Sequence, residues 1–356
     1  MSKRDGVPLW KSLGIRLISL TLALIVCAVI IYALTKLNPL KVYAAMFKGA
    51  FGTNKRIWVT IRDIVMLLCI SVGLAPAFKM RFWNIGAEGQ VLVGGIVSAA
   101  CMIYLGKMIP TLPLLVLMFV VSIIAGGIWG IIPAIFKARW NANETLFTLM
   151  MNYIAIQLTS FFVAKWENPF GSNTVGIINQ MTKAGWFPSI GGQMYLLNVI
   201  IVVSLAVLMY FYLRYSKQGY EIAVVGESEN TARYAAINVK SVVVRTMAIS
   251  GAICGIAGFI AVAGASHTIS TSTAGGQGFT AIIVAWLSRF NTFIMMAISA
   301  LLVFLEKGAV EIASQFDLND FVSEMITGII LFFILGSEFF INYKVRFRRG
   351  KKGAGK

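Results

Sequence analysis

Polar side chains gather in one short stretch, KMRFWNIGAEGQVLVGG (residues 79–95), which lies between two long apolar runs. Asn84 and Glu88 are four residues apart and would share one face of a helix, and Gln90 follows them. A carboxylate is costly in a membrane helix and usually faces a water-filled route or a partner. Two interpretations stay open: Glu88 lines a route for a polar solute, or it lies beside a helix N-terminus capped by Asn84 and interacts with the helix dipole.

Two further amides occur where a lipid-facing helix would have apolar residues. Asn152 lies inside the apolar run 145–164, and Gln277 lies where the run 274–288 begins. For Asn152, a hydrogen bond between helices is the alternative to a place on a solute route. The candidate substrate pathway therefore consists of Asn84, Glu88, Gln90, Asn152 and Gln277.

The sequence lacks the residue patterns of an enzyme. It has no G-x-x-x-x-G-K-S/T stretch and so no phosphate-binding loop for ATP. The single histidine, His267, follows Ser266 directly, and adjacent residues on a helix do not face each other. The four cysteines lie in apolar runs, and no cluster of potential ligands has metal-site spacing. We expect no catalytic residue, no cofactor and no metal.

The composition identifies the solvent that surrounds these residues. Of the 356 residues, 58% are hydrophobic and only 13% are charged, against about 25% charged in a soluble domain. Such a chain must expose most of its apolar surface to a lipid bilayer. The first apolar run, 15–34, is long enough to span and has no cleavage pattern after it, so we interpret it as a retained signal anchor.

Runs of apolar residues predict an all-α polytopic membrane protein with about ten transmembrane helices. The predicted spans are 15–34, 58–78, 84–105, 112–136, 145–164, 194–213, 243–265, 274–288, 292–313 and 321–342. The eighth is short and has three glycines, Gly275, Gly276 and Gly278, at its start, so it is either extended towards its N-terminus or broken. The segment 165–193, with Trp166 and Trp186, is expected to fold against the membrane surface.

The net charge of +17 does not indicate a nucleic-acid partner. With the N-terminus in the cytoplasm, most lysines and arginines fall in segments that face the cytoplasm, as the positive-inside rule requires. Ten spans also place the basic tail, 343–356, in the cytoplasm. We therefore predict one transmembrane domain, 1–356, with both termini cytoplasmic.

The order of spans predicts an inverted repeat. Spans two to five begin outside and spans seven to ten begin inside, which is the arrangement that such a repeat needs. The third span has GAEGQ (86–90) near its start, and the eighth has GGQGF (275–279) at its start. The repeat would place two glycine-rich helix starts opposite one another around a route.

The segment 214–242 is the cytoplasmic loop large enough to contain a helix of its own. Its centre reads GESENTARYAAINV (226–239), in which Ser228 or Asn230 can cap a short helix. The alternative is a solvated connector without a binding role.

Five stretches resemble one family of transporters. FWNIGAEGQ (82–90), NETLFTLMMNYIA (143–155), GESENTARYAAINV (226–239), SGAICGIAG (250–258) and GQGFTAIIVAWLSRFN (276–291) are similar to signatures of ABC-importer permeases of the branched-chain amino acid, ribose and nucleoside group. They look most like the nucleoside and simple-sugar branch. Trp286, Ser288 and Thr292 depart from the usual Leu, Gly and Pro, and Ala236 replaces a usual Gly.

The resemblance implies a function and a set of partners. The chain would be the non-catalytic permease subunit of an importer in a bacterial plasma membrane, working with a separate ABC ATPase. A second, related permease chain would form a heterodimer with it, and an extracytoplasmic binding lipoprotein would deliver a nucleoside or simple sugar. Residues 227–237 would form the coupling helix that docks on the ATPase through Glu227, Asn230, Arg233, Tyr234 and Ile237. The rivals are a secondary transporter driven by an ion gradient and an intramembrane enzyme.

Overall fold

The computed structural model describes residues 2–3 and 9–317, and residues 325–344 except for gaps at 327, 331, 334, 335, 338, 340 and 342. Much of the predicted tenth span, 321–342, and most of the basic tail, 343–356, therefore lie outside the described residues. The structure divides into a terminal unit, Met1–Ile57 with Leu302–Lys356, and a central unit, Trp58–Leu301.

The terminal unit contains α1 (Leu9–Thr35), α2 (Pro39–Phe51) and the second half of α12 (Thr292–Gln315). Two short strands, β1 (Ser2–Lys3) and β2 (Tyr343–Lys344), pair antiparallel. Asn38 caps α2 by accepting a hydrogen bond from the amide of Leu40, and Pro39 occupies the first turn. The Phe47 and Phe304 rings, 5.4 Å apart, pack α2 on α12.

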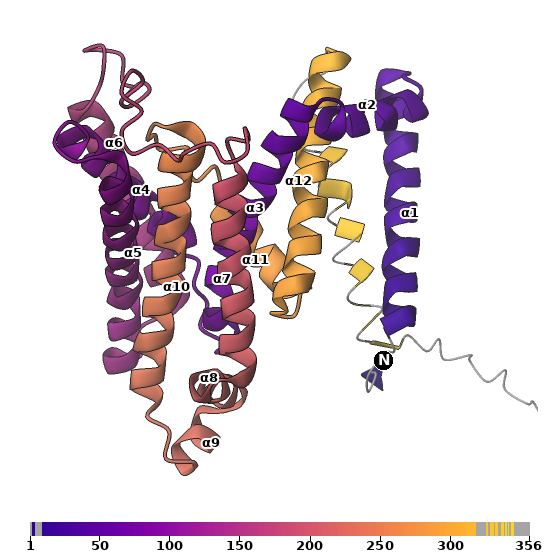
Figure 1. Ribbon diagram of the computed structural model, residues 1–356. Coiled ribbons are helices and arrows are strands. Elements are labelled where there is room, and N and C mark those ends of the chain that lie inside the picture. The colour runs from indigo at the N-terminus through magenta and orange to yellow at the C-terminus, as the bar shows by residue number, and fades with distance from the viewer. Residues whose placement is uncertain are drawn as a thin grey trace, which may run out of the picture. The chain divides into compact units, whose positions relative to one another are not determined.

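The central unit is a bundle of long helices with a shorter helical segment at one end (Figure 1). Its helices are α3 (Asn54–Lys79, from residue 58), α4 (Ala87–Leu105), α5 (Thr111–Trp140), α6 (Glu144–Lys165), α7 (Leu196–Tyr215), α8 (Lys217–Glu227), α9 (Glu229–Tyr234), α10 (Val239–Ala261), α11 (Gln277–Leu287) and the start of α12. A π-helical turn, η1 (Val262–Ser266), continues α10.

Seven helices of the described chain are long and apolar enough to cross a membrane, namely α3, α4, α5, α6, α7, α10 with η1, and α12. This confirms the all-helical, multi-pass architecture. The count of ten spans and the inverted repeat stay predictions. Most of the seven also expose large apolar side chains, as helices that face lipid do.

The predicted eighth span, 274–288, is only half as long as a spanning helix. The helix α11 begins at Gln277, after Gly275 and Gly276 with φ of 58° and 73°, and it contains 11 residues. At 1.5 Å per residue it is about 17 Å long, whereas the hydrocarbon core is about 30 Å thick. The first backbone amides of any helix have no acceptor within that helix. Because α11 is too short to begin at one membrane surface and also end at the other, its first amides need acceptors from other parts of the protein.

Small residues bring α4, α5 and α10 into close contact. A β-carbon at Gly126 of α5 would lie 2.3 Å from the carbonyl oxygen of Gly251 in α10, and one at Gly94 of α4 would lie 2.4 Å from that of Gly255. Ser98 and Ser122 share a hydrogen bond of 2.8 Å between α4 and α5. Without a hydrophobic driving force in lipid, such close backbone packing and buried hydrogen bonds hold helices together.

The segment between α6 and α7 folds back on the bundle, while the prediction that 165–193 lies against the membrane surface stays a prediction. Trp186 stacks on His267 with ring centroids 3.8 Å apart, and the Ile178 amide donates to the His267 carbonyl at 2.9 Å. Trp166 donates from Nε1 to the hydroxyl of Tyr104 at 2.9 Å. Burial lowers the pKa of His267, which favours the neutral, stacked imidazole.

Two neighbouring glycines of α5 provide a test of the close packing. We expect Gly126→Ala to lower the free energy of unfolding by about 1–3 kcal/mol, because its β-carbon would collide with the backbone of α10. Gly127→Ala is the matched control, since its β-carbon would have no contact nearer than 3.4 Å. The measurement is the thermal unfolding midpoint of each purified variant in detergent. Equal midpoints for the two variants would contradict the packing.

Candidate functional site

The start of α4 differs from the predicted span 84–105. The helix begins at Ala87, and its N-cap is Gly86, which has no side chain to cap the helix. Asn84 instead accepts a hydrogen bond from the Gly86 amide at 3.0 Å, in a turn that precedes the helix. In the second interpretation of Glu88, the cap assigned to Asn84 is therefore wrong, although Glu88 does lie in the first turn of α4.

Glu88 caps a different helix. Its side chain is buried, with the residue 7% exposed, and its two carboxylate oxygens accept from the amides of Gly276 at 2.8 Å and Gly278 at 2.9 Å. Gly276 is the N-cap of α11 and offers no side chain of its own. The carboxylate thus binds the unpaired amides of α11, where the positive end of the helix dipole also favours an anion.

The approach of α11 to Glu88 requires a glycine. A β-carbon at Gly278 would lie 2.7 Å from the backbone nitrogen of Glu88 and 2.7 Å from its Oε2. The two glycine-rich stretches, GAEGQ (86–90) and GGQGF (275–279), therefore meet at the starts of α4 and α11. This contact is the arrangement that the repeat would produce, while the repeat itself stays a prediction.

Helix α6 caps α4 in the same way. Asn152 accepts from the Gly89 amide and donates to the Ile85 carbonyl, both at 2.8 Å. Thr148 accepts from the Ile85 amide at 3.1 Å. The side chain of Asn152 therefore has the helix-to-helix hydrogen bonds expected in one of its two interpretations. Because α6 caps α4 and α4 caps α11, a chain of polar contacts links three helices.

Asn84 and Gln90 complete the buried polar cluster. The Asn84 amide group donates to Gln90 Oε1 at 3.4 Å and to the Ser250 hydroxyl of α10 at 3.2 Å. Gln277 lies between the two glycines that donate to Glu88, and its Oε1 atom is buried without a hydrogen-bond partner. The five residues predicted from sequence therefore gather around the starts of α4 and α11, and we call them the α4–α11 cluster.

Trp286 gives α11 a second contact at its other end. Its ring stacks on Trp83, with centroids 5.3 Å apart, and Phe78 packs edge-on against both rings. Trp286 departs from the family pattern, and sequence reasoning gave it no role. The segment that precedes α4 therefore holds α11 near its C-terminus, while Glu88 holds it at the N-terminus.

The predicted coupling helix, 227–237, is shorter than expected. The helix is interrupted at Ser228, whose backbone is extended, with φ of −162° and ψ of 121°. Glu227 is therefore the last residue of α8 and does not belong to α9. Ser228 caps α9 by accepting from the amide of Thr231 at 3.3 Å, as one of the two predicted caps. The helix contains six residues and ends at Tyr234, and Ile237 lies beyond a left-handed Ala236.

The exposed face of α9 presents side chains of both charges and an aromatic ring. Tyr234 is 92% exposed, and Asn230 is also exposed. Arg233 lies 3.6 Å from Glu229 one turn away, and both side chains are largely in solvent. An exposed tyrosine beside an arginine is typical of protein-binding surfaces.

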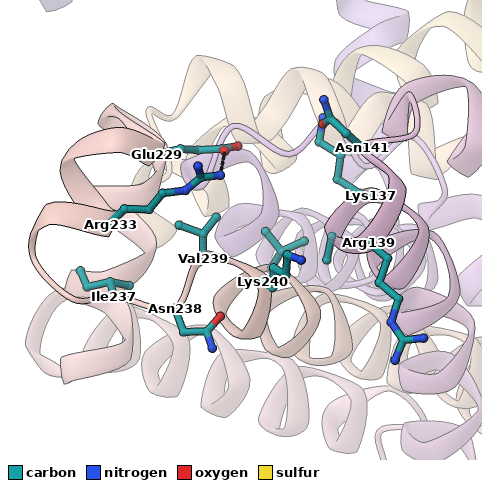
Figure 2. Close-up of a pocket in the computed structure, with 11 residues that line it drawn as sticks. Lys137, Arg139, Asn141, Glu229, Arg233, Ile237, Asn238, Val239 and Lys240 are labelled. Carbon is teal, nitrogen blue, oxygen red and sulfur yellow. Dashed lines mark ion pairs between the residues drawn. The ribbon is translucent and has the colours of Figure 1, made fainter.

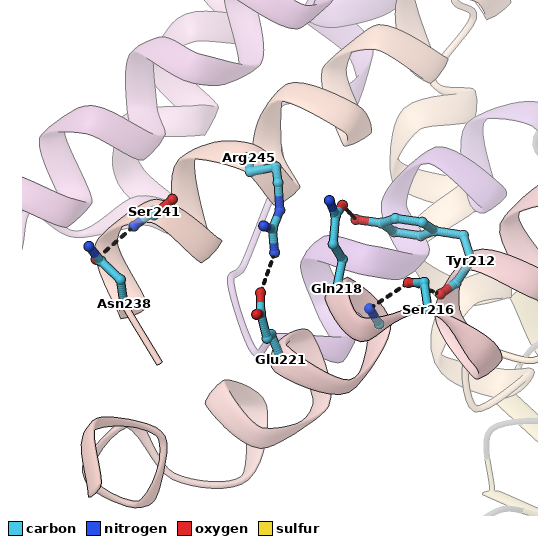
Figure 3. A network of polar contacts seen from close by, with 8 residues as sticks. Tyr212, Ser216, Gln218, Glu221, Asn238, Ser241 and Arg245 are labelled. Carbon is cyan, nitrogen blue, oxygen red and sulfur yellow. Dashed lines mark hydrogen bonds and ion pairs between the residues drawn. The ribbon is translucent and has the colours of Figure 1, made fainter. Parts of the chain in front are cut away.

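Helix α8 is fixed to three long helices, and Figure 3 shows its contacts with α7 and α10. Glu221 forms an ion pair of 2.7 Å with Arg245 of α10. At the junction with α7, the Tyr212 hydroxyl donates to Gln218 Oε1 at 2.9 Å. A β-carbon at Gly226 would lie 2.2 Å from the carbonyl oxygen of Lys79, so the end of α8 lies directly against the end of α3. Sequence reasoning missed the anchors to α3 and α10 because their partners lie on other helices, which the local pattern does not identify.

A cavity of about 620 Å³ lies between the end of α5, α9 and the start of α10 (Figure 2). Lys137 and Arg139 approach it from α5, and Arg233 approaches it from α9, with Lys240 of α10 between them. Lys137 is paired with Glu144 at 2.9 Å. The cavity gives the short helix α9 an open, mainly basic flank. Among the described residues, no group of three or more His, Cys, Asp or Glu side chains could hold a metal ion.

Comparison with known proteins gives a consistent result. Residues 57–335 match the family described as branched-chain amino acid transport system / permease component. The guanosine ABC transporter permease protein NupP of Bacillus subtilis is 32% identical, over 88% of this chain and 89% of its own. A glucose ABC transporter permease protein of Haloferax volcanii is 26% identical, over 99% of this chain and 95% of its own. The guanosine ABC transporter permease protein NupQ of B. subtilis is 26% identical, over 58% and 67%. No solved structure gives a significant match.

Substitutions at Glu88 test its role as the cap of α11. We expect Glu88→Ala to lower the free energy of unfolding by about 1–3 kcal/mol for each amide left buried without a partner. Glu88→Gln keeps one acceptor oxygen and should lose less. Thermal unfolding of the purified variants measures both effects. A Glu88→Ala protein as stable as the unsubstituted chain would contradict the cap.

Proposed function

The chain belongs to the family of permease components of branched-chain amino acid transport systems, and from this premise we propose that it forms the translocation pathway of an ATP-driven importer of nucleosides. The observation that carries the proposal is the similarity to NupP, which is named as a guanosine ABC transporter permease and is matched along nearly the whole chain. Simple sugars are the second candidate class, because a relative of similar coverage is named as a glucose permease.

The proposed complex has four kinds of subunit. A separate ABC ATPase binds α9 through Asn230, Arg233 and Tyr234, while Glu227 and Ile237 flank the contact. Two relatives from one organism, NupP and NupQ, are both named as guanosine ABC transporter permeases, which supports a second, related permease in a heterodimer here. An extracytoplasmic binding lipoprotein would supply the solute. The proposed site is a bacterial plasma membrane, with ten spans and both termini in the cytoplasm.

The proposed mechanism begins at α9. When ATP closes the ATPase dimer, α9 moves with it, and α8 transmits the movement to α10 through the Glu221–Arg245 ion pair and to α7 through their junction. Helix α10 packs on α4 and α5 through backbone contacts at glycines, so a displacement of α10 is passed to them. Such movements change access to a route by rearranging packed helices between two states.

The α4–α11 cluster is the proposed pathway site. In this structure Asn84, Gln90 and Asn152 form hydrogen bonds within the protein, and both carboxylate oxygens of Glu88 accept from amides at the start of α11. The Oε1 atom of Gln277 has no partner. A movement of α10 would pull on Asn84 through Ser250 and so on the start of α4. Separation of α4 from α11 would release the amides of α11 and the carboxylate of Glu88, which could then bind hydroxyl groups of a solute.

Reconstitution with the ATPase tests the proposal. Proteoliposomes that contain this chain, its ATPase, the second permease and the binding lipoprotein should accumulate labelled guanosine only with ATP. Tyr234→Asp should abolish accumulation and ATPase binding while the thermal unfolding midpoint stays unchanged, because Tyr234 is exposed. Accumulation by this chain alone, driven by a proton or sodium gradient, would refute the proposal in favour of a secondary transporter.

The ion pair between Glu221 of α8 and Arg245 of α10 can be tested as the link that transmits movement. We expect Glu221→Gln to reduce guanosine accumulation per ATP hydrolysed several-fold while changing stability by less than about 1 kcal/mol, because the pair is partly exposed. The exchange Glu221→Arg with Arg245→Glu restores the attraction and should recover part of the coupling. The ratio of transport to ATP hydrolysis in proteoliposomes is the measurement. An unchanged ratio in Glu221→Gln would show that α8 does not transmit movement through this pair.

A further inference from the structure

A groove of about 460 Å³ lies where the end of α5 meets the start of α10. We call it the α5–α10 groove. It is lined by Ile135, Ala138 and Arg139 of α5 and by Lys240, Ser241, Val244 and Arg245 of α10. Neither α8 nor α9 lines it, so it belongs to the ends of two membrane-spanning helices.

Apart from Arg245, the lining of the groove changes from apolar to cationic along both helices. On α5, Ile135 lies one turn before Arg139, and on α10, Val244 lies one turn after Lys240. The two helices run in opposite directions, so Ile135 and Val244 lie further into the membrane than Arg139 and Lys240. Arg245, the third cation of the lining, lies beside Val244 and is paired with Glu221. This profile matches a phospholipid, whose acyl chains and phosphate follow one another in the same order.

Two charges of the groove lack an opposite charge. Arg245 is paired with Glu221 at 2.7 Å. Arg139 and Lys240 are exposed, and no acidic side chain within the described residues forms an ion pair with either. Two uncompensated cations that line one groove favour an anion between them. The groove is therefore prepared for a negatively charged group.

We propose that the α5–α10 groove binds an anionic phospholipid of the cytoplasmic leaflet. Arg139 and Lys240 hold the phosphate, the Ser241 hydroxyl donates to it, and Ile135 and Val244 contact the carbons below it. Trp140 follows Arg139 and is 64% exposed, as expected of a tryptophan at the level of lipid headgroups. This proposal rests on the topology of the proposed function, which places the end of α5 at the cytoplasmic surface, and not on the solute transported.

Lipid binding here would affect coupling. Arg139 and Lys240 also line the cavity beside α9, so one bound phosphate would fix the α5 and α10 ends against which α9 moves. Stimulation of the ATPase by this permease should therefore depend on the fraction of anionic lipid in the membrane.

Native mass spectrometry of the full chain, with no ATPase and no solute, tests the site. The probes are phosphatidylglycerol and phosphatidylcholine with identical acyl chains. We expect preferential binding of phosphatidylglycerol, and about 25-fold weaker binding in the double variant Arg139→Gln/Lys240→Gln, at about fivefold per cation. The matched control, Arg214→Gln/Lys217→Gln, removes the same charge at the junction of α7 and α8 and should bind as the unsubstituted chain does.

A charge-retaining exchange separates the site from a folding defect. Arg139→Lys/Lys240→Arg keeps both cations and should retain phosphatidylglycerol. Equal binding by the glutamine double variant and the control would overturn the proposal. Displacement of the lipid by millimolar inorganic phosphate would show that the groove binds free phosphate. If the glutamine double variant lost ATPase pull-down but bound lipid as before, the groove would belong to the ATPase contact. Either result would overturn the lipid site. Failure of the lipid test leaves the proposed transport function standing, because no transport enters the measurement.

Discussion

A backbone amide buried in a membrane protein has no water to bind, and this constraint decides how the central unit is built. Helix α11 is half-length, so its first amides need acceptors from elsewhere. Glu88 supplies both of them from the first turn of α4. The start of α4 has the same need, and Asn152 of α6 meets it. The polar side chains in these apolar helices are present because two helices begin inside the bundle.

The same contacts reconcile the two interpretations of Glu88. A carboxylate that caps a helix is a structural group, and a carboxylate that can be released from that helix can also bind solute. The energy of two charge-assisted hydrogen bonds keeps α4 and α11 together in the described state. In the proposed cycle, a solute hydroxyl would replace an amide of α11, so opening would not leave the charge without partners.

Movement can reach this cluster because the intervening helices pack through backbone contacts. Gly126, Gly251 and Gly255 leave no flexible side chains between α5 and α10 to absorb a displacement. At the other end, α8 lies against the end of α3 and is paired to α10 through Arg245. A short exposed helix, α9, joined to such a rigid array is suited to receive force from a soluble partner.

The sequence by itself determined the membrane class, most helix positions and the family, because these depend on composition over windows of about 20 residues and on local motifs. It also identified Glu88 and Asn152 as unusual. Only the tertiary structure decided what they bind, because Glu88 meets amides 188 and 190 residues away, and a backbone amide has no signature in sequence. The half-length of α11 and the break at Ser228 were likewise decided by contacts with other helices and by local backbone geometry, which hydropathy does not encode.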